Sequence, residues 1–166
     1  MVGSAGVFLE RQTFAGILVL LASSACDDPP PKPEPRQPPP GRVELVQASA
    51  GADALATIAR EAARAQRDGK KLVVYVGAPW CEPCVRFHDA AAAGRLDQTF
   101  PELRLLEFDR DRDEAELGKA GCLSRLIPLF ARPSPEGRCS ERRIEGSIKG
   151  EGAVAEITPR LRGLLE

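Results

Sequence analysis

The sequence predicts an α/β domain, and two observations lead to this prediction. Apolar runs typical of strands alternate with helical patterns through residues 42–166, as expected when helices connect successive strands. A Cys-x-x-Cys motif, Cys81 to Cys84, lies where the most apolar run ends and a helical pattern begins. A cysteine pair at such a junction is typical of a redox site.

The expected order is strand, helix, strand, helix, strand, helix, two strands, helix. Strands are expected over residues 43–47, 72–77, 103–108, 127–131 and 138–144, and helices over 52–68, 81–93, 111–121 and 151–165. The strand 43–47 alternates apolar and polar residues, whereas 72–77 is continuously apolar, as in a central strand covered on both faces. Apolar residues recur at helical spacing in 52–68, and Gly69 follows as a stop signal.

Three local signals organise the second half of the domain. Asp111 is expected to cap a helix, because Glu114 follows three residues later as in a capping box. The turn-forming segment 133–137 is expected to join its flanking strands into a hairpin. In the last helical pattern, Pro159 is expected to kink the helix or to mark its true start, with Thr158 as the cap.

The motif itself predicts a chemical role for each cysteine. Cys81 lies near a helix N-terminus, where the helix dipole favours a thiolate, so it is the expected nucleophile. Cys84 lies three residues later on the same face and is the expected resolving thiol. Pro83 falls in the first turn, where a missing N–H costs little.

Trp80-Cys81-Glu82-Pro83-Cys84, the strand before it and Ile127-Pro128 together resemble the thioredoxin superfamily. The resemblance implies a thioredoxin-like fold, with a central mixed β-sheet flanked by helices on both faces. It also implies a cis-proline at Pro128 that faces the cysteines, with Trp80 and Ile127 beside it at the substrate. The implied activity is thiol–disulfide exchange with protein substrates. The Cys81–Cys84 pair carries the electrons, so neither an organic cofactor nor a metal is expected.

The chain departs from the family pattern behind the cysteines. Tyr75 stands where the family has a buried aspartate, and the aspartate's partner lysine maps to about Leu105. The usual proton acceptor is therefore missing, and Glu82, His88 or water remain as candidates. Glu82 beside Cys81 also opposes the thiolate, which favours a more reducing couple.

These features favour an enzyme that reduces protein disulfides, and three other interpretations compete with it. A purely structural bridge between Cys81 and Cys84 is disfavoured, because it would close very few residues. A copper-binding module would use Cys81, Cys84 and His88, which lie on one helical face. A disulfide oxidase or isomerase would use the same cysteines on the same fold. Replacement of Cys84 by Ser separates redox exchange from metal binding.

Two further cysteines, Cys122 and Cys139, have no evident role. In the expected hairpin register, Cys139 lies near the turn and Cys122 near the opposite end of the strand. The two are therefore expected to be too far apart for a bridge, whose Cα atoms must approach within about 7 Å. Cys122 is expected to be a small buried residue.

Residues 1–26 resemble a bacterial export signal of the lipoprotein type, with Cys26 as the lipidated residue. Ser23 stands where such signals usually have leucine, so ordinary cleavage after Ala25 competes with lipidation. Residues 27–41 contain eight prolines and are expected to form an extended linker.

These features place the domain outside the inner membrane. The expected location is the periplasmic side of the cell envelope, with a lipid anchor and with electrons supplied by a membrane thiol transporter. The formal net charge of −1 provides no strong field for nucleic acid or an anionic membrane surface.

Overall fold

The computed structural model describes residues 41–166, so the expectations for the signal 1–26, for Cys26 and for nearly all of the linker lie outside it. The elements are β1 (Glu44–Gln47), α1 (Ala54–Arg67), β2 (Lys71–Gly77), α2 (Glu82–Ala92), β3 (Leu103–Asp109), α3 (Glu114–Lys119), β4 (Leu129–Pro133), β5 (Cys139–Glu145) and α4 (Ala153–Leu165). No helix within 41–166 has the length and apolar character needed to cross a membrane.

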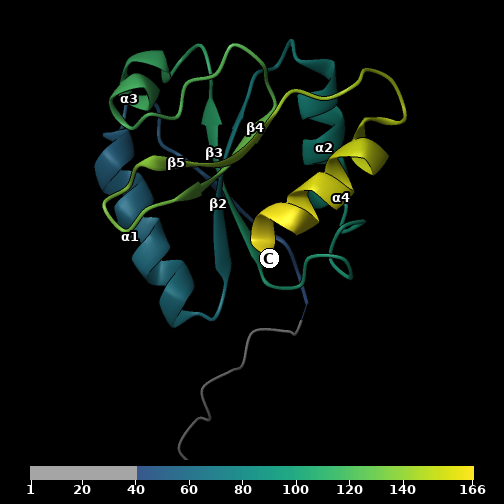
Figure 1. The fold of residues 1–166 in the computed structure, drawn as a ribbon, viewed down its shortest axis with the longest axis horizontal. Helices are drawn as coiled ribbons and strands as arrows, with labels where there is room; N and C mark the ends of the chain where they lie inside the picture. The colour runs from purple at the N-terminus through teal and green to yellow at the C-terminus, as the bar shows by residue number, and fades with distance from the viewer. Residues whose placement is uncertain (1–40) are drawn as a thin grey trace, which may run out of the picture. The chain divides into compact units, whose positions relative to one another are not determined.

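The strands form one mixed five-stranded sheet in the order β1-β3-β2-β4-β5. The three strands β1, β3 and β2 run parallel, and the β4–β5 hairpin is added antiparallel to β2. Figure 1 shows the sheet at the centre of the domain with helices on both sides. This arrangement confirms the predicted α/β class and its thioredoxin-like sheet.

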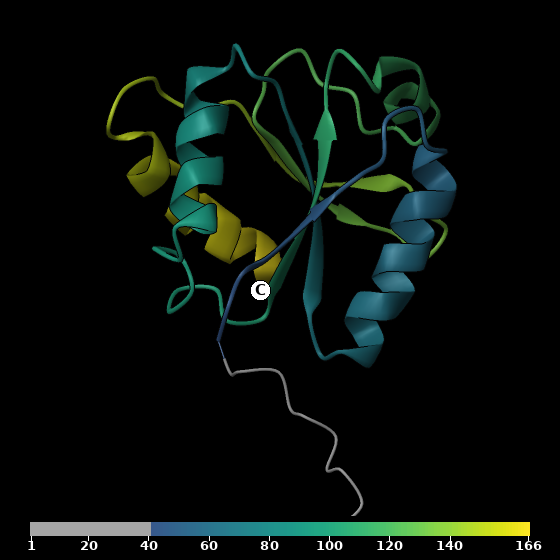
Figure 2. The ribbon, with the colours of Figure 1, turned by 180° about the vertical axis from the view of Figure 1, so that it is seen from behind.

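Each face of the sheet has its own hydrophobic core. On one face, α2 and α4 cover a cluster that includes Val73, Phe87 and Ile157, and we call this the α2–α4 face. On the other, α1 and α3 cover a cluster that includes Ile58 and Leu117, the α1–α3 face. Figures 1 and 2 show these helix pairs on opposite sides of the strands. Strand residues alternate between the two cores, as the pleat requires.

The prediction of Asp111 as a helix cap is wrong, and of the two alternatives for Pro159 the structure contradicts a helix start there. The residue before α3 is Asp113, whereas Asp111 lies outside the helix and its carboxylate binds other side chains. Pro159 lies inside α4, which begins at Ala153 rather than at the proline. The Thr158 hydroxyl donates to the Val154 carbonyl at 2.7 Å instead of capping a helix start. Apolar contacts on both sides of Pro159 hold α4 on the sheet despite the missing N–H.

The β4–β5 turn reaches across to the N-terminal half of α1. Gly137 in this turn has φ +86°, and a Cβ at this position would collide with the Leu55 carbonyl. The backbone can approach α1 this closely only because residue 137 lacks a side chain. The hairpin turn thus lies on the α1–α3 face, where the twist of the sheet brings it.

Candidate active site

The two cysteines of the motif are joined at the N-terminus of α2. Cys81 is the residue preceding the helix and forms a disulfide with Cys84, with their Cα atoms 5.2 Å apart. Both cysteines are buried, with exposed fractions of 5% and 2%, so only a closely fitting partner reaches the bond. Pro83 lies in the first turn of α2, where backbone N–H groups have no partner within the helix. The N–H that proline lacks is therefore not needed there. The helix dipole favours the thiolate of Cys81 after reduction.

Glu82 is paired on the outside of α2. Its carboxylate accepts a hydrogen bond from Arg86 Nε at 2.8 Å, one turn along the helix. This hydrogen bond holds the pKa of the Glu82 carboxyl below its usual value, with smaller contributions from the Gly150 N–H and Lys149. The positive charge of Arg86 therefore offsets part of the repulsion that Glu82 exerts on a Cys81 thiolate.

Trp80 lies on the surface rather than in the core. Its side chain is 64% exposed, and its Nε1 donates to the Asp111 carboxylate at 2.6 Å. That hydrogen bond, together with Arg110, lowers the pKa of Asp111. The indole thus presents an apolar face to solvent directly before Cys81.

The peptide bond between Ile127 and Pro128 is cis, at the start of β4. Pro128 is buried, and its carbonyl accepts the Gly146 N–H at 2.9 Å. Ile127 is partly buried and packs against the core cluster that contains both motif cysteines. Before it, Leu126 is 61% exposed, and its N–H and carbonyl are both bound by the Ser124 hydroxyl.

Several large apolar side chains are exposed, and some of them lie next to the cysteine motif or the cis-peptide bond. The large hydrophobic residues most exposed among 41–166 are Trp80, Val85, Leu123, Leu126 and Ile148. Trp80 and Val85 flank the cysteine motif, and Leu126 precedes the cis-peptide bond. Ile148 lies in the loop whose Gly150 N–H reaches Glu82. Exposed apolar side chains of this size are typical of a surface that contacts another protein.

Tyr75 lies directly behind Cys84. Its hydroxyl donates to the Cys84 carbonyl at 2.9 Å, and its ring stacks on Phe130. Burial, with the nearby charge of Glu107, raises the pKa of Tyr75 far above its usual value, so the phenol stays protonated. Its hydroxyl therefore orients the backbone at Cys84 and cannot take up a proton.

The residue opposite Tyr75 on β3 is Glu107, and the prediction of Leu105 there is wrong, because Leu105 pairs with Val73. Gln47 of β1 pairs with the other side of Glu107. The sequence pattern holds a signal for this residue, since Leu103, Leu105 and Glu107 alternate onto one face of the strand. A carboxylate that follows two buried leucines in register is itself directed inward.

Glu107 is buried, with an exposed fraction of 3%, and its two oxygens have different partners. One lies 2.9 Å from His88 Nδ1, and the other accepts from Gln47 Nε2 at 2.6 Å. A cavity of about 260 Å³ opens beside them, and Cys84, His88 and Glu107 all contribute to its wall.

His88 is thus placed on the cysteine face of α2 but is committed to Glu107. Among residues 41–166, no three His, Cys, Asp or Glu side chains are grouped so that they could hold a metal ion. The copper-module interpretation therefore finds no preformed ligand set in the described part of the chain.

The second cysteine pair corrects an expectation. Cys122 and Cys139 form a disulfide, with Cα atoms 5.1 Å apart, so the prediction that they lie too far apart is wrong. The segment after α3 runs beside the start of β5, where the Cys139 N–H donates to the Ala120 carbonyl at 3.0 Å. The twist of the sheet brings the hairpin turn next to the end of α3. The hairpin register alone does not show this proximity.

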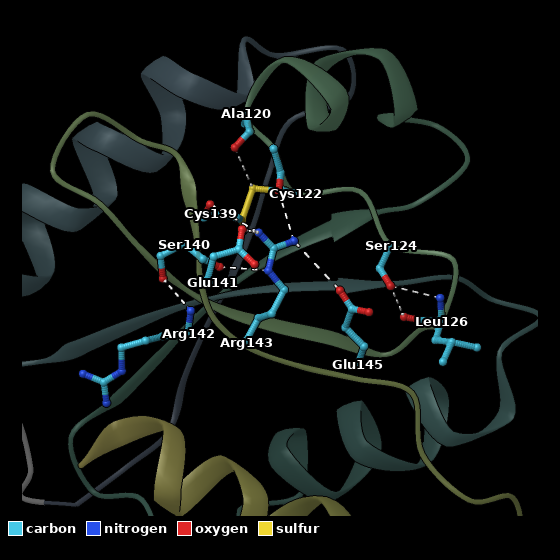
Figure 3. Close-up of polar contacts among 11 residues, drawn as sticks. Ala120, Cys122, Ser124, Leu126, Cys139, Ser140, Glu141, Arg142, Arg143 and Glu145 are labelled. Atoms are coloured by element: carbon cyan, nitrogen blue, oxygen red, sulfur yellow. Dashed lines mark hydrogen bonds and ion pairs between the residues drawn. A yellow bond between two sulfur atoms is a disulfide. The ribbon is translucent and has the colours of Figure 1, made fainter.

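Figure 3 shows Arg143 beside this second disulfide. The guanidinium donates to the carbonyls of Ser140, Gly121 and Cys139 at 2.8, 3.3 and 3.5 Å. It also lies 3.9 Å from the Glu145 carboxylate. Arg143 thus ties the backbone next to one cysteine to the backbone next to the other.

The fold and the first cysteine pair together define a class of protein. A thioredoxin-like sheet, a disulfide at the N-terminus of α2 and a cis-proline at the start of β4 are the features of a thiol–disulfide oxidoreductase with a thioredoxin-like fold.

No protein-family model matches the chain, and no curated protein sequence matches it. Among solved structures, wild-type poplar thioredoxin h is 22% identical with a TM-score of 0.48, over 76% of this chain and 98% of its own. Fasciola hepatica thioredoxin is 24% identical with a TM-score of 0.44, over 72% and 97%. A structure from work on thiol resolution in a yeast mitochondrial 1-Cys peroxiredoxin is 18% identical with a TM-score of 0.47, over 72% and 92%.

Proposed function

We propose that the protein reduces protein disulfides through Cys81 and Cys84 on the outer side of a bacterial inner membrane. The observation that carries the proposal is the Cys81–Cys84 disulfide at the start of α2. The cis bond before Pro128 and the exposed Trp80 and Leu126 provide a surface for an extended substrate segment.

The reaction proceeds in two exchanges. The Cys81 thiolate attacks one sulfur of the substrate disulfide, and the other substrate sulfur leaves as a thiolate and takes up a proton. Cys84 then loses its proton and attacks Cys81, which releases the second substrate thiolate and forms the Cys81–Cys84 disulfide. The protein gives up two electrons and the substrate disulfide receives them.

Reduction is the favoured direction for this chain. Glu82 destabilises the Cys81 thiolate, only partly offset by Arg86, and a less stable thiolate makes the couple more reducing. Electrons would come from a membrane thiol transporter. The expected export signal and the lipid on Cys26 would keep the domain near that donor.

Replacement of Cys84 by Ser tests the exchange. A redox enzyme accumulates mixed disulfides through Cys81 in this variant, and these disappear on treatment with a reductant. The double variant Cys81→Ser/Cys84→Ser is the control and traps nothing. If Cys84→Ser traps no partner and copper binding is lost with it, the protein is a metal carrier and the redox proposal is wrong.

The direction of transfer is tested by the reduction potential of the Cys81–Cys84 couple in glutathione buffers. A value near −270 mV, about that of thioredoxin, supports a reductant. A value near −120 mV, about that of a strong disulfide donor, supports the oxidase alternative instead.

A further inference from the structure

We propose that Glu107 is the base that accepts the proton of Cys84 when Cys84 attacks the mixed disulfide. This inference rests on the proposed function. It supplies the proton acceptor that is missing because Tyr75 stands where a buried aspartate was expected. Glu107 acts from the strand next to Tyr75, across the cavity that both side chains share with Cys84.

The position of Glu107 follows from the sheet. Leu103 and Leu105 pack into the core of the α2–α4 face, and Glu107 continues their alternation toward α2 at the carboxyl end of β3. The register sets it between Gln47 and Tyr75. A carboxylate is thereby held among buried groups on the side of the sheet where Cys84 lies.

Burial of this carboxylate requires an explanation. A buried charge without a fixed cation lowers stability. Of the two side chains bound to Glu107, Gln47 is neutral and His88 carries charge only when protonated. A glutamine at position 107 would retain hydrogen bonds to Gln47 and His88 without that cost. A titratable group that lies in a buried cavity beside a reactive thiol indicates an acid–base role.

Other charged groups around the cavity are already engaged. The Asp109 carboxylate accepts the N–H groups of Asp111 and Arg112, both at 2.9 Å. Arg112 is paired with Asp113 at 2.7 Å. On α2, Asp89 acts on Tyr75 through its charge alone.

The two candidate bases named from the sequence are less suited to Cys84. The carboxylate of Glu82 is on the outer side of α2 and is held by Arg86. His88 lines the cavity, but its Nδ1 faces Glu107, and its side chain is 40% exposed. The arrangement assigns proton uptake to Glu107 and places His88 between it and solvent.

Proton transfer to Glu107 accompanies formation of the Cys81–Cys84 bond. Glu107 takes the proton of the Cys84 thiol through water, for which a cavity of about 260 Å³ has ample room. The Cys84 sulfur forms a bond to the Cys81 sulfur, and the bond from Cys81 to the substrate breaks. The substrate thiolate takes a proton from solvent, and Glu107 returns its own proton to solvent at the cavity mouth.

The test follows the two exchanges separately. The reduced protein is mixed with one equivalent of a dithiobis(nitrobenzoate), whose coloured thiolate is released once when Cys81 attacks and again when Cys84 resolves the adduct. In Glu107→Gln we expect the first release to match the wild type. We expect the second to be slower on the order of a hundredfold near neutral pH, the size of general-base effects. Its rate should then rise in proportion to hydroxide, as for a thiol deprotonated by solvent.

The matched control is Glu61→Gln, which removes a second buried carboxylate on α1, on the opposite face of the sheet. Both releases are expected to match the wild type. A second release in folded Glu107→Gln within twofold of the wild type overturns the inference and leaves the proposed function intact. Absence of both releases in the wild type contradicts the proposed function instead.

If Glu107→Gln fails to fold, Glu107→Asp decides the question. It keeps the charge but draws the carboxylate back from the cavity by one methylene. A second release that is several-fold slower, with an unchanged first release, supports the inference. A second release at the wild-type rate overturns it.

Discussion

Trp80 is held at the surface by one short polar contact, its hydrogen bond to Asp111 at 2.6 Å. Because the chain contains a single tryptophan, its fluorescence reports on this side chain alone. Asp111 is not in the helix it was expected to cap, and it is therefore free to orient the indole before Cys81.

The Trp80–Asp111 contact predicts an acid transition. The pKa of Asp111 is lowered from its usual 3.8 in the folded protein, chiefly by the hydrogen bond from Trp80. A lowered folded pKa means that the hydrogen bond to a charged carboxylate is complete above the unfolded value, and that it weakens to a bond with a neutral carboxyl as the pH falls through the folded value. Trp80 emission of the oxidised protein is therefore expected to be constant from neutral pH down to 3.8 and to change only below it.

The Asp111→Asn variant is the control for this transition. Its side-chain carbonyl still accepts from the indole, but nothing at position 111 titrates, so the acid change in emission is expected to disappear. An identical acid change in the variant would show that another group is responsible.

Among single residues, those assigned to the chemistry differ in how clearly the sequence identifies them. Cys81 and Cys84 are defined by their spacing at a strand–helix junction, which is a local property. Identification of Glu107 depends on how β2 and β3 align. The alignment expected from the sequence was offset by two residues and placed Leu105 opposite Tyr75 instead. The sequence reveals that β3 is a strand but not which of its residues faces Tyr75.

At the scale of elements, the strand and helix order was predictable because each element has its own apolar pattern. The errors occur where tertiary contacts decide. α4 continues through Pro159 because Ile157 and Leu161 are both fully buried in the core. The Cys122–Cys139 bond forms because the twisted hairpin meets the end of α3, and no local pattern specifies that meeting.

The second disulfide is expected to stabilise the fold. It joins residues 17 apart in sequence, and closure of a loop of this size contributes about 3 kcal/mol in the chain-entropy account. The double variant Cys122→Ala/Cys139→Ala is therefore expected to lose about this much free energy of unfolding. Urea denaturation of the oxidised proteins measures the loss.

The matched control is Cys81→Ala/Cys84→Ala, which removes a bond between residues only 3 apart. The shorter loop predicts a smaller loss of stability. An equal or greater loss in this control would contradict the assignment of the stabilising role to Cys122–Cys139.

For the whole molecule, a lipid on Cys26 and the proline-rich linker would together determine where the domain works. Fifteen residues rich in proline, extended at about 3.1 Å each, would hold the domain some tens of ångströms from the membrane surface. Cys26→Ala is expected to move the protein from the membrane fraction to the soluble periplasmic fraction. Unchanged sedimentation with membranes would contradict lipid anchoring, and Cys122→Ala serves as a control that leaves the anchor intact.

The placement of the two disulfides on opposite faces of one sheet has a consequence for how the cysteines can pair. A chain with four cysteines that exchanges disulfides could in principle join them in the wrong combination. Cys81 and Cys84 belong to the core of the α2–α4 face, whereas Cys122 and Cys139 belong to that of the α1–α3 face. All four cysteines are buried, so neither pair reaches the other around the edge of the domain. The sheet thus divides the four sulfurs into two pairs that cannot exchange partners within one chain.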